Sequence, residues 1–298
     1  MKILLTGKNG QVGFELQRAL APLCELHAVG SSDCDLTDAS ALRRLIDAVK
    51  PQLIINTAAY TAVDRAESEP DRANALNTHA LQVMGESARK IGAPVVHFST
   101  DYVFDGNKVG SYTESDAPNP QSAYGKSKLA GEVALAQATP HHLILRTSWV
   151  TGAHGSNFVK TILKKAQELD TLRVVSDQFG APTSAALLAD VTAHLVRQYQ
   201  QQGADSFPFG LYHLTASGST NWHAFARYVL QQALLSGVAL KASPDQVQAI
   251  SAKDFGAAAS RPANSRLNTT HFQNTFGLRL PDWQQGISHL LQQTFKAP

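Results

Sequence analysis

Cysteine is scarce in this chain of 298 residues, which has only Cys24 and Cys34. The two cysteines form no CxxC pair, and two thiols in this length do not make a disulfide framework. We therefore expect the protein to work in the reducing cytoplasm. The 11 histidines are scattered, and no spacing of His, Cys and Asp predicts a catalytic metal site.

A surplus of charge of one sign is also missing, because 26 basic and 24 acidic residues leave a net charge of +2. This balance argues against nucleic acid or an acidic membrane surface as a partner. Apolar runs stay far below the roughly 18 residues of a membrane span. The opening MKILLTGKNG passes from a short apolar run into a glycine turn, which predicts a first strand and not a signal peptide.

The first half of the chain contains short apolar runs that alternate with helical patterns. The predicted strands are 2–7, 25–29, 52–59, 94–99 and 142–149. The predicted helices are 13–22, 38–50, 70–92 and 122–138, and Asp38 is expected to cap the second of them. This order predicts an α/β fold with a doubly wound parallel sheet of the Rossmann type, and a dinucleotide-binding domain over 1–150. Ligands of such sheets bind at the carboxyl ends of the strands.

The pattern loosens after about residue 150. Helices are expected at 157–169, 184–201 and 221–236, with short strands at 172–175 and 210–214, and a polar surface loop at 199–210. We expect residues 151–298 to form mainly a smaller substrate-binding lobe, with a segment at about 184–214 returning to the first domain.

The stretch TGKNGQVG places Gly7, Gly10 and Gly13 between a predicted strand and a predicted helix. Glycines here allow a tight turn and the close approach of a pyrophosphate, although a tight turn without a ligand would give the same pattern. The second strand ends in Gly30 with no acid in the usual place for the ribose hydroxyls, and Asp33 comes slightly late. We therefore expect dual use of NADPH and NADH.

A tyrosine and a lysine four residues apart, Tyr124 and Lys128, lie in a predicted helix. Residues at this spacing share a helical face at about 5–6 Å, so an ammonium would lower the pKa of the phenol and make it a usable acid. Tyr102 has no such lysine. A hydroxyl at the end of the fourth strand, from Ser99 or Thr100, could polarise a carbonyl; alternation along a strand allows only one of them to serve.

Several longer segments resemble the dTDP-4-dehydrorhamnose reductases of the extended short-chain dehydrogenase/reductase family, from residue 1 to about 295. They are GQVGFELQRALAP, NTAAYTAVDRAESEP, STDYVFDG, YGKSKLAGE, LRTSWV, DQFGAPTSA and SRPANSRLN. The resemblance implies that NADPH or NADH reduces the 4-keto group of dTDP-4-dehydro-β-L-rhamnose. The product would be dTDP-β-L-rhamnose, the last step of its biosynthesis for surface polysaccharide.

The resemblance also implies roles for individual residues. Tyr124 would donate the proton, Lys128 would be its partner and Thr100 would polarise the carbonyl. With the glycine loop and the strand ends, the expected cofactor contacts are Gly7, Gly10, Gln11, Val12, Gly13, Asp35, Leu36, Ala58, Ala59, Tyr60, Thr61, Tyr124 and Lys128. The expected contacts to the dTDP-sugar are Thr100, Asp101, Trp149, Arg261 and Arg266.

Two of these assignments have plainer readings from the residues alone. A tryptophan that ends a strand, such as Trp149, is often part of the core. Arg261 and Arg266 offer forked donors suited to a diphosphate, but the turn around Pro262 could equally be solvated.

The resemblance leaves open a Mg²⁺ ion and a homodimer that the ion would bridge. Glu15 matches one of the family's carboxylates, whereas Ala186 and Gln293 stand at the other positions. One carboxylate makes a poor Mg²⁺ site, so we doubt both the ion and the dimer that it would bridge.

Three functions are weighed for the chain. The first is reduction by NAD(P)H; the second is a sugar-nucleotide epimerase, or a reductase of a related dTDP-4-keto-6-deoxy sugar. The third is a non-catalytic regulatory subunit, which would have lost Tyr124 or Lys128, and both residues are intact.

Overall fold

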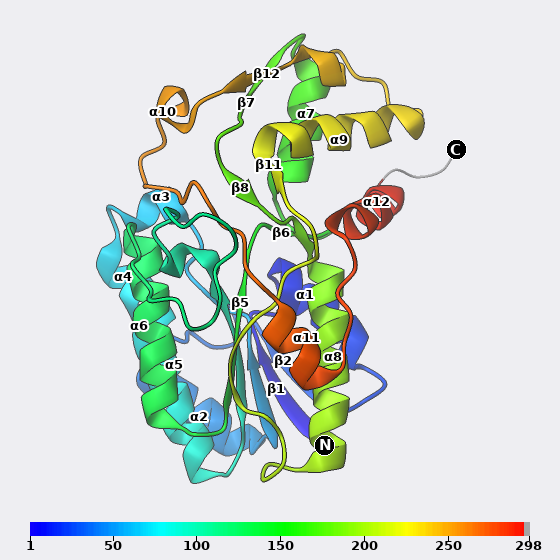
Figure 1. Ribbon diagram of the computed structural model, residues 1–298. Coiled ribbons are helices and arrows are strands. Elements are labelled where there is room, and N and C mark those ends of the chain that lie inside the picture. The colour runs from blue at the N-terminus through cyan, green and yellow to red at the C-terminus, as the bar shows by residue number, and fades with distance from the viewer. Residues whose placement is uncertain (295–298) are drawn as a thin grey trace.

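The computed structural model describes residues 1–294, and its centre is one sheet of six parallel strands (Figure 1). In sheet order the strands are β10 (Gly210–His213), β5 (His142–Thr147), β4 (Val95–Thr100), β3 (Leu53–Asn56), β1 (Lys2–Thr6) and β2 (Glu25–Val29). The predicted α/β fold with a doubly wound parallel sheet is confirmed.

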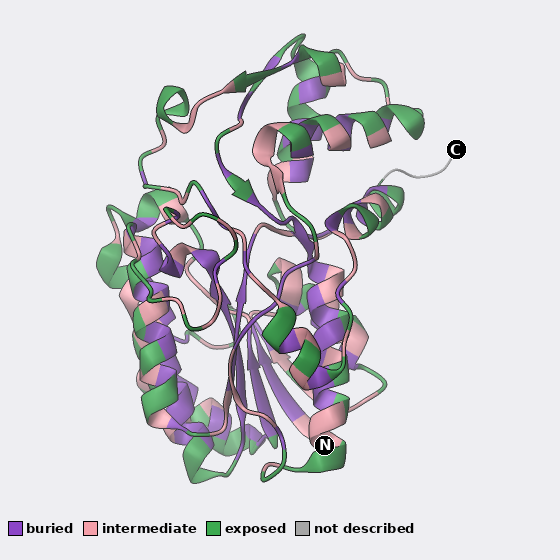
Figure 2. Ribbon diagram, viewed as in Figure 1, coloured by how far each residue is buried: buried purple, intermediate pink, exposed green. Residues whose placement is uncertain are grey.

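Helices cover both faces of the sheet, and side-chain alternation along β1 shows why. Ile3 and Leu5 join the core that includes α1 (Gln11–Leu20), α8 (Ala185–Gln202) and α11 (Thr270–Phe276), whereas Leu4 joins the core on the opposite face. The opposite core contains α2 (Ala39–Val49), α5 (Ala80–Lys90) and α6 (Ala123–Ala138). The inner strands of the sheet are buried on both faces, as the purple colour in Figure 2 shows.

The start and end of α2 follow from local chemistry. The carboxylate of Asp38 accepts hydrogen bonds from the backbone N–H groups of Ser40 (2.8 Å) and Ala41 (3.1 Å), so the predicted cap is confirmed. The helix stops at Lys50, whose φ of 48° is left-handed, just before Pro51.

The predicted helix over 70–92 is interrupted in its middle. It consists of α4 (Pro70–Asn74), a π-helical segment η1 (Ala75–His79) and α5, and a short α3 (Val63–Ala66) precedes it. The wider turn brings buried Asn77 against α6, where a Cβ on Gly131 would lie 2.0 Å from the Asn77 carbonyl oxygen. A π-helical turn of this kind is common at functional sites, and here it lies behind the strand ends.

The lobe drawn above the sheet in Figure 1 has its own core. Its paired strands are β6 (Val150–Thr151) with β9 (Thr183–Ser184), β7 (Leu172–Val175) with β12 (Val247–Ile250), and β8 (Phe179–Gly180) with β11 (Thr220–Asn221). Its helices are α7 (Phe158–Glu168), α9 (Trp222–Leu235), η3 (Pro244–Gln246), α10 (Ala252–Phe255) and α12 (Trp283–Thr294). The helices expected at 157–169 and 221–236 are confirmed to within a residue or two, and the strand at 172–175 is confirmed as well. Positions 295–298 of the expected lobe lie outside the described residues.

Helix α8 and strand β10 lie with the sheet rather than with the lobe, since β10 pairs with β5 and α8 shares the core of α1. The prediction of a polar loop over 199–210 is wrong at its start, because α8 continues to Gln202. Phe207 is buried against Tyr199, so the remaining loop also contributes to the core. Across the described chain, no helix combines the length and apolar character needed to cross a bilayer.

Candidate active site

A cavity of about 1210 Å³ opens at the carboxyl ends of β1, β3, β4 and β5. Most of the predicted site residues line it: Gly7, Gly10, Gln11, Val12, Asp35, Leu36, Ala58, Ala59, Tyr60, Thr61, Thr100, Asp101, Tyr124, Lys128 and Trp149. Gly13, Arg261 and Arg266 are not among the lining residues. The volume exceeds the range of about 300–1,000 Å³ for common small-molecule sites.

The glycine loop is shaped to bring backbone close to a ligand. Gly7 has a left-handed φ of +81°, and a Cβ there would lie 2.6 Å from the amide nitrogen of Ala58. Gly13 lies behind the loop, since its Cβ would be 2.1 Å from the Gly7 carbonyl oxygen. Gly10 stands at the N-cap of α1, so backbone N–H groups of the first turn are left for an anion at the cavity wall. This cradle fits the pyrophosphate of a dinucleotide.

A lysine of the glycine loop, Lys8, is paired with Asp33 beyond the end of β2, and the sequence pattern did not reveal this pair. The Asp33 carboxylate accepts from Gly30 N–H (2.8 Å) and lies 2.7 Å from Lys8 Nζ, and these contacts hold the pKa of Asp33 below its usual range. A Cβ at Gly30 would lie 2.7 Å from the side-chain amide nitrogen of Asn9. Asp33 is therefore already paired with a cation and a backbone N–H group.

The loop after β3 is held to the cavity by Asn77 of η1. The Asn77 side chain accepts from Tyr60 N–H (2.8 Å) and donates to the Tyr60 carbonyl oxygen (3.1 Å) and to Ser127 Oγ (3.0 Å). The Tyr60 hydroxyl donates to Glu69 (2.7 Å). Sequence reasoning missed Asn77, because an asparagine within an amphipathic helical pattern carries no signal of its partners.

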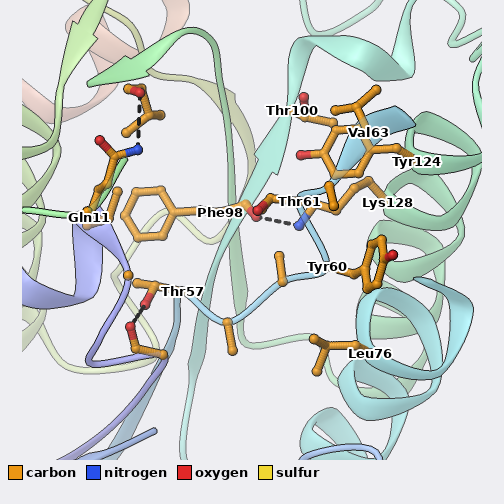
Figure 3. Close-up of a pocket in the computed structure, with 18 of the residues that line it drawn as sticks. Gln11, Thr57, Tyr60, Thr61, Val63, Leu76, Phe98, Thr100, Tyr124 and Lys128 are labelled. Carbon is orange, nitrogen blue, oxygen red and sulfur yellow. Dashed lines mark hydrogen bonds between the residues drawn. The ribbon is translucent and has the colours of Figure 1, made fainter. Parts of the chain in front are cut away.

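Tyr124 and Lys128 both lie on α6, and the Lys128 nitrogen is bonded to β4 rather than to the phenol (Figure 3). Lys128 Nζ donates to the Phe98 carbonyl oxygen (2.7 Å) and lies 2.9 Å from His97 Nε2. Burial lowers the pKa of Lys128 to about 7. The expected lowering of the Tyr124 pKa is not found: burial raises it to about 12, and a hydrogen bond with Thr100 opposes this rise. Lys128 does not lower the pKa of the phenol, because its nitrogen is bonded to the Phe98 carbonyl oxygen and to His97 of β4.

The polar residues at the end of β4 have separate partners. Ser99 Oγ donates to buried Glu132, which forms an ion pair with Arg146 at 2.6 Å. Thr100 is therefore the hydroxyl beside Tyr124, as Figure 3 shows. Burial raises the pKa of Asp101 to about 6, and its Oδ2 has no hydrogen-bond partner within residues 1–294. A buried carboxyl oxygen without a partner calls for an explanation, and a hydroxyl of a ligand would supply the missing hydrogen bond.

Trp149 lines the cavity just after β5. Its φ of 50° is unusual for a non-glycine residue, and its ring stacks on Trp222 with centroids 3.6 Å apart. Both rings line the cavity, so Trp149 combines a packing role with a surface offered to a ligand. Trp222 was missed because it comes from the lobe, at the start of α9, with no motif around it.

The arginines of SRPANSRLN are engaged in pairs outside the cavity lining. Arg261 holds both carboxylate oxygens of Asp64, at 2.7 and 3.1 Å. Arg266 Nε donates to the Asn264 side chain at 2.8 Å. Asn264 and Ser265 are buried, so the segment is packed rather than a solvated turn. The diphosphate role of the two arginines stays a prediction.

Glu15, the carboxylate considered as a Mg²⁺ ligand, lies beside an arginine in the structure. Arg18 of α1 contacts Glu15 at 3.3 Å and Asp190 of α8 at 2.9 Å. Gln293 hydrogen-bonds His289 at 3.1 Å. The described part of the chain has no group of three or more His, Cys, Asp or Glu side chains that could hold a metal ion.

Comparisons with known proteins agree with this geometry. The family model described as RmlD substrate binding domain matches residues 1–295. A dTDP-4-dehydrorhamnose reductase of Shigella flexneri is 47% identical over 299 residues, covering 99% of this chain and 98% of that protein. The enzyme of the same name from Escherichia coli K12 is 46% identical with the same coverage. A dTDP-4-dehydrorhamnose reductase from Bacillus anthracis, crystallised in complex with NADP, superposes with a TM-score of 0.90 at 33% identity and covers 98% of this chain and 99% of its own.

Proposed function

The chain belongs to the dTDP-4-dehydrorhamnose reductase family, and from that premise we propose that it reduces dTDP-4-dehydro-β-L-rhamnose to dTDP-β-L-rhamnose. The observation that carries the proposal is that one cavity contains both the glycine loop and the Tyr124–Thr100 pair. NADPH or NADH, when bound, supplies the hydride. Residues 1–150 bind the dinucleotide, the segment 184–214 completes their sheet, and 151–298 otherwise form mainly the sugar lobe.

Tyr124 is the proton donor in this proposal. Its raised pKa of about 12 keeps the hydroxyl protonated at neutral pH, so the proton is present when negative charge develops on the C4 oxygen. Thr100 lies beside Tyr124, and its hydroxyl opposes the rise in the pKa of the phenol. Lys128 places a buried cation, when it is protonated, one helical turn below the phenol.

The sugar nucleotide occupies the other end of the cavity. Asp101 offers its open carboxyl oxygen to a sugar hydroxyl, and Trp149 offers a ring face. Arg261 and Arg266 serve the diphosphate once the sugar nucleotide competes for their present partners.

The decisive assay follows NADPH oxidation with the dTDP-4-keto sugar, comparing the wild type with Tyr124→Phe. Loss of the proton donor is expected to lower kcat by about 10²- to 10⁴-fold. Tyr102→Phe is the matched control, because the Tyr102 ring meets Tyr124 edge to face at 5.4 Å and loses the same atom. Full activity in Tyr124→Phe, or an equal loss in both variants, would refute the assignment. Net oxidation of NADPH also separates reduction from epimerisation, which has no net redox change.

The proposal places the enzyme in the cytoplasm, on the basis of its two free cysteines and its nucleotide-linked substrate. It also includes a homodimer without a bridging metal, since Glu15 already has Arg18 as its cation. Sedimentation with and without EDTA tests this: the dimer should persist after chelation, and its dissociation would indicate a metal bridge.

A further inference from the structure

A buried chain of polar side chains lies behind Lys128. His97 is in β4, with 1% of its surface exposed, and lies between Asn56 of β3 and Lys128 of α6. His97 Nδ1 is 3.0 Å from Asn56 Nδ2, and His97 Nε2 is 2.9 Å from Lys128 Nζ. The reaction scheme above uses neither Asn56 nor His97, although both contact the machinery of the site.

The direction of each hydrogen bond in this chain follows from one backbone group. The Ala58 N–H lies 3.1 Å from Asn56 Oδ1, and an N–H group can only donate. The Thr6 hydroxyl also donates to this oxygen. The amide orientation of Asn56 is thereby fixed, and its NH₂ group must face His97. His97 Nδ1 is therefore the acceptor, and the ring proton of the neutral imidazole is on Nε2.

The Nε2–H of His97 points at the nitrogen of Lys128, so Lys128 must accept this hydrogen bond. An ammonium has three donors and no lone pair, whereas a neutral amine can accept. We propose that Asn56 and His97 hold Lys128 as a neutral amine and so set the pH above which the active site loses its cation. His97 and Asn56 are positioning residues in this scheme. The catalytic part of the inference rests on the proposed function, and the protonation part does not.

The charges around Lys128 agree with this assignment. Burial lowers the pKa of Lys128 to about 7, and burial also lowers the pKa of His97 well below its usual value. Glu132, one turn along α6, raises the pKa of Lys128, but its carboxylate is shared with Arg146 of β5. Two other titratable groups lie nearby. Tyr124 stays neutral at pH 7, and the pKa of Asp101, which follows β4, is raised to about 6.

The first test is the tautomer of His97 in the protein without nucleotide. Two-bond ¹⁵N–¹H correlations at pH 9, assigned by the loss of one signal in His97→Gln, should show the proton on Nε2. Asn56→Asp is nearly isosteric and should reverse the tautomer. One carboxylate oxygen would accept from the Ala58 N–H and the other from the His97 ring, so the ring proton should move to Nδ1. A wild-type ring protonated on Nδ1 would overturn the proposal.

The second test is the titration of Lys128, followed through its ¹⁵Nζ and ¹³Cε signals. His97→Gln adds no charge, and its amide can turn an oxygen toward the lysine, so the Lys128 pKa should rise by about one unit or more. His142→Gln is the control, since His142 starts the neighbouring strand β5 and bonds only locally to the Thr139 carbonyl oxygen. An unchanged Lys128 pKa in both His97→Gln and Asn56→Asp would refute the assignment.

Catalysis gives the third readout. The kcat/KM of the wild type should fall above about pH 7 as Lys128 loses its proton, and His97→Gln should move this fall to higher pH. If the tautomer and the titration behave as expected but the pH profile does not move, the polar chain is correct and the role of Lys128 in the proposed function is wrong. If turnover is absent altogether, the first two tests still decide the inference.

Discussion

The buried pair of Glu132 and Arg146 gives the most quantitative prediction for stability. Their side chains are 6% and 3% exposed, and Arg146 donates through Nε at 2.9 Å and through Nη2 at 2.6 Å. Glu132→Gln keeps the shape but removes the charge, leaving a buried guanidinium without compensation. Breaking such a pair costs about 3–5 kcal/mol. The upper half of this range is expected here, because Nη1 of Arg146 already has no hydrogen-bond partner among residues 1–294.

Urea unfolding at pH 7 measures this loss against a matched surface pair. Arg43 and Glu86 are 3.3 Å apart with side chains 43% and 40% exposed, so Glu86→Gln should cost at most about 1 kcal/mol. The double variant Glu132→Leu/Arg146→Met should recover most of the loss, since it leaves no charge unpaired. A cost for Glu132→Gln no larger than that for Glu86→Gln would refute the reasoning.

The same substitution should also act on the active site. Glu132 raises the pKa of Lys128, so Glu132→Gln should lower it further below about 7. The fall of kcat/KM with rising pH should therefore begin at lower pH, opposite to the shift expected for His97→Gln. An unchanged pH profile would show that Arg146 screens Glu132 completely.

Three further predictions concern other parts of the cavity. Asp33→Asn frees Lys8 from its 2.7 Å ion pair, so the protein should bind 2′,5′-ADP about two- to fivefold more tightly. Binding of 5′-AMP should not change. Equal effects on the two ligands, measured by calorimetry, would contradict this prediction. The Asp101 pKa is raised in the folded state from 3.8 to about 6, so the unfolded chain ionises first as pH rises. Wild-type stability should fall by up to about 3 kcal/mol between about pH 4 and 6, and Asp101→Asn should lack this fall in urea unfolding; parallel curves would exclude it. The Cβ of Gly125→Ala would lie 2.3 Å from the Tyr102 carbonyl oxygen. Both Tm and kcat should therefore drop, with a loss of about 1–3 kcal/mol in the free energy of unfolding. Unchanged values of Tm and kcat would show that α6 can shift freely.

The sheet and the pairing of Tyr124 with Lys128 could be predicted because their signals are local. Apolar runs of five or six residues indicate buried parallel strands, and a four-residue spacing puts two side chains on one helical face. The spacing does not fix where the side-chain ends go. Lys128 turns to the Phe98 carbonyl oxygen, a contact from another strand, so the electrostatic argument about the Tyr124 pKa was wrong while the placement of both residues was right.

The π-helical segment and most strands of the lobe could not be predicted, for two different physical reasons. A wider turn at 75–79 keeps the amphipathic pattern, so Asn77 gives no signal of its bonds to Tyr60. Apart from β7, which was expected at 172–175, the lobe strands were missed, because segments of two to four residues are too short to show a period. The stacking of Trp222 on Trp149 depends on how the lobe meets the sheet, which no local pattern encodes.

Polar side chains in the buried strand β4 would be costly if they lacked partners, and α6 supplies one for most of them. His97 meets Lys128, Ser99 meets Glu132 and Thr100 meets Tyr124. The three residues on α6 are four apart, so successive turns of one helix face are each fixed to one strand. A rotation of α6 would break several buried hydrogen bonds together. The polar run at the end of β4 therefore fixes the orientation of the helix that presents Tyr124, and it forms one wall of the cavity as well.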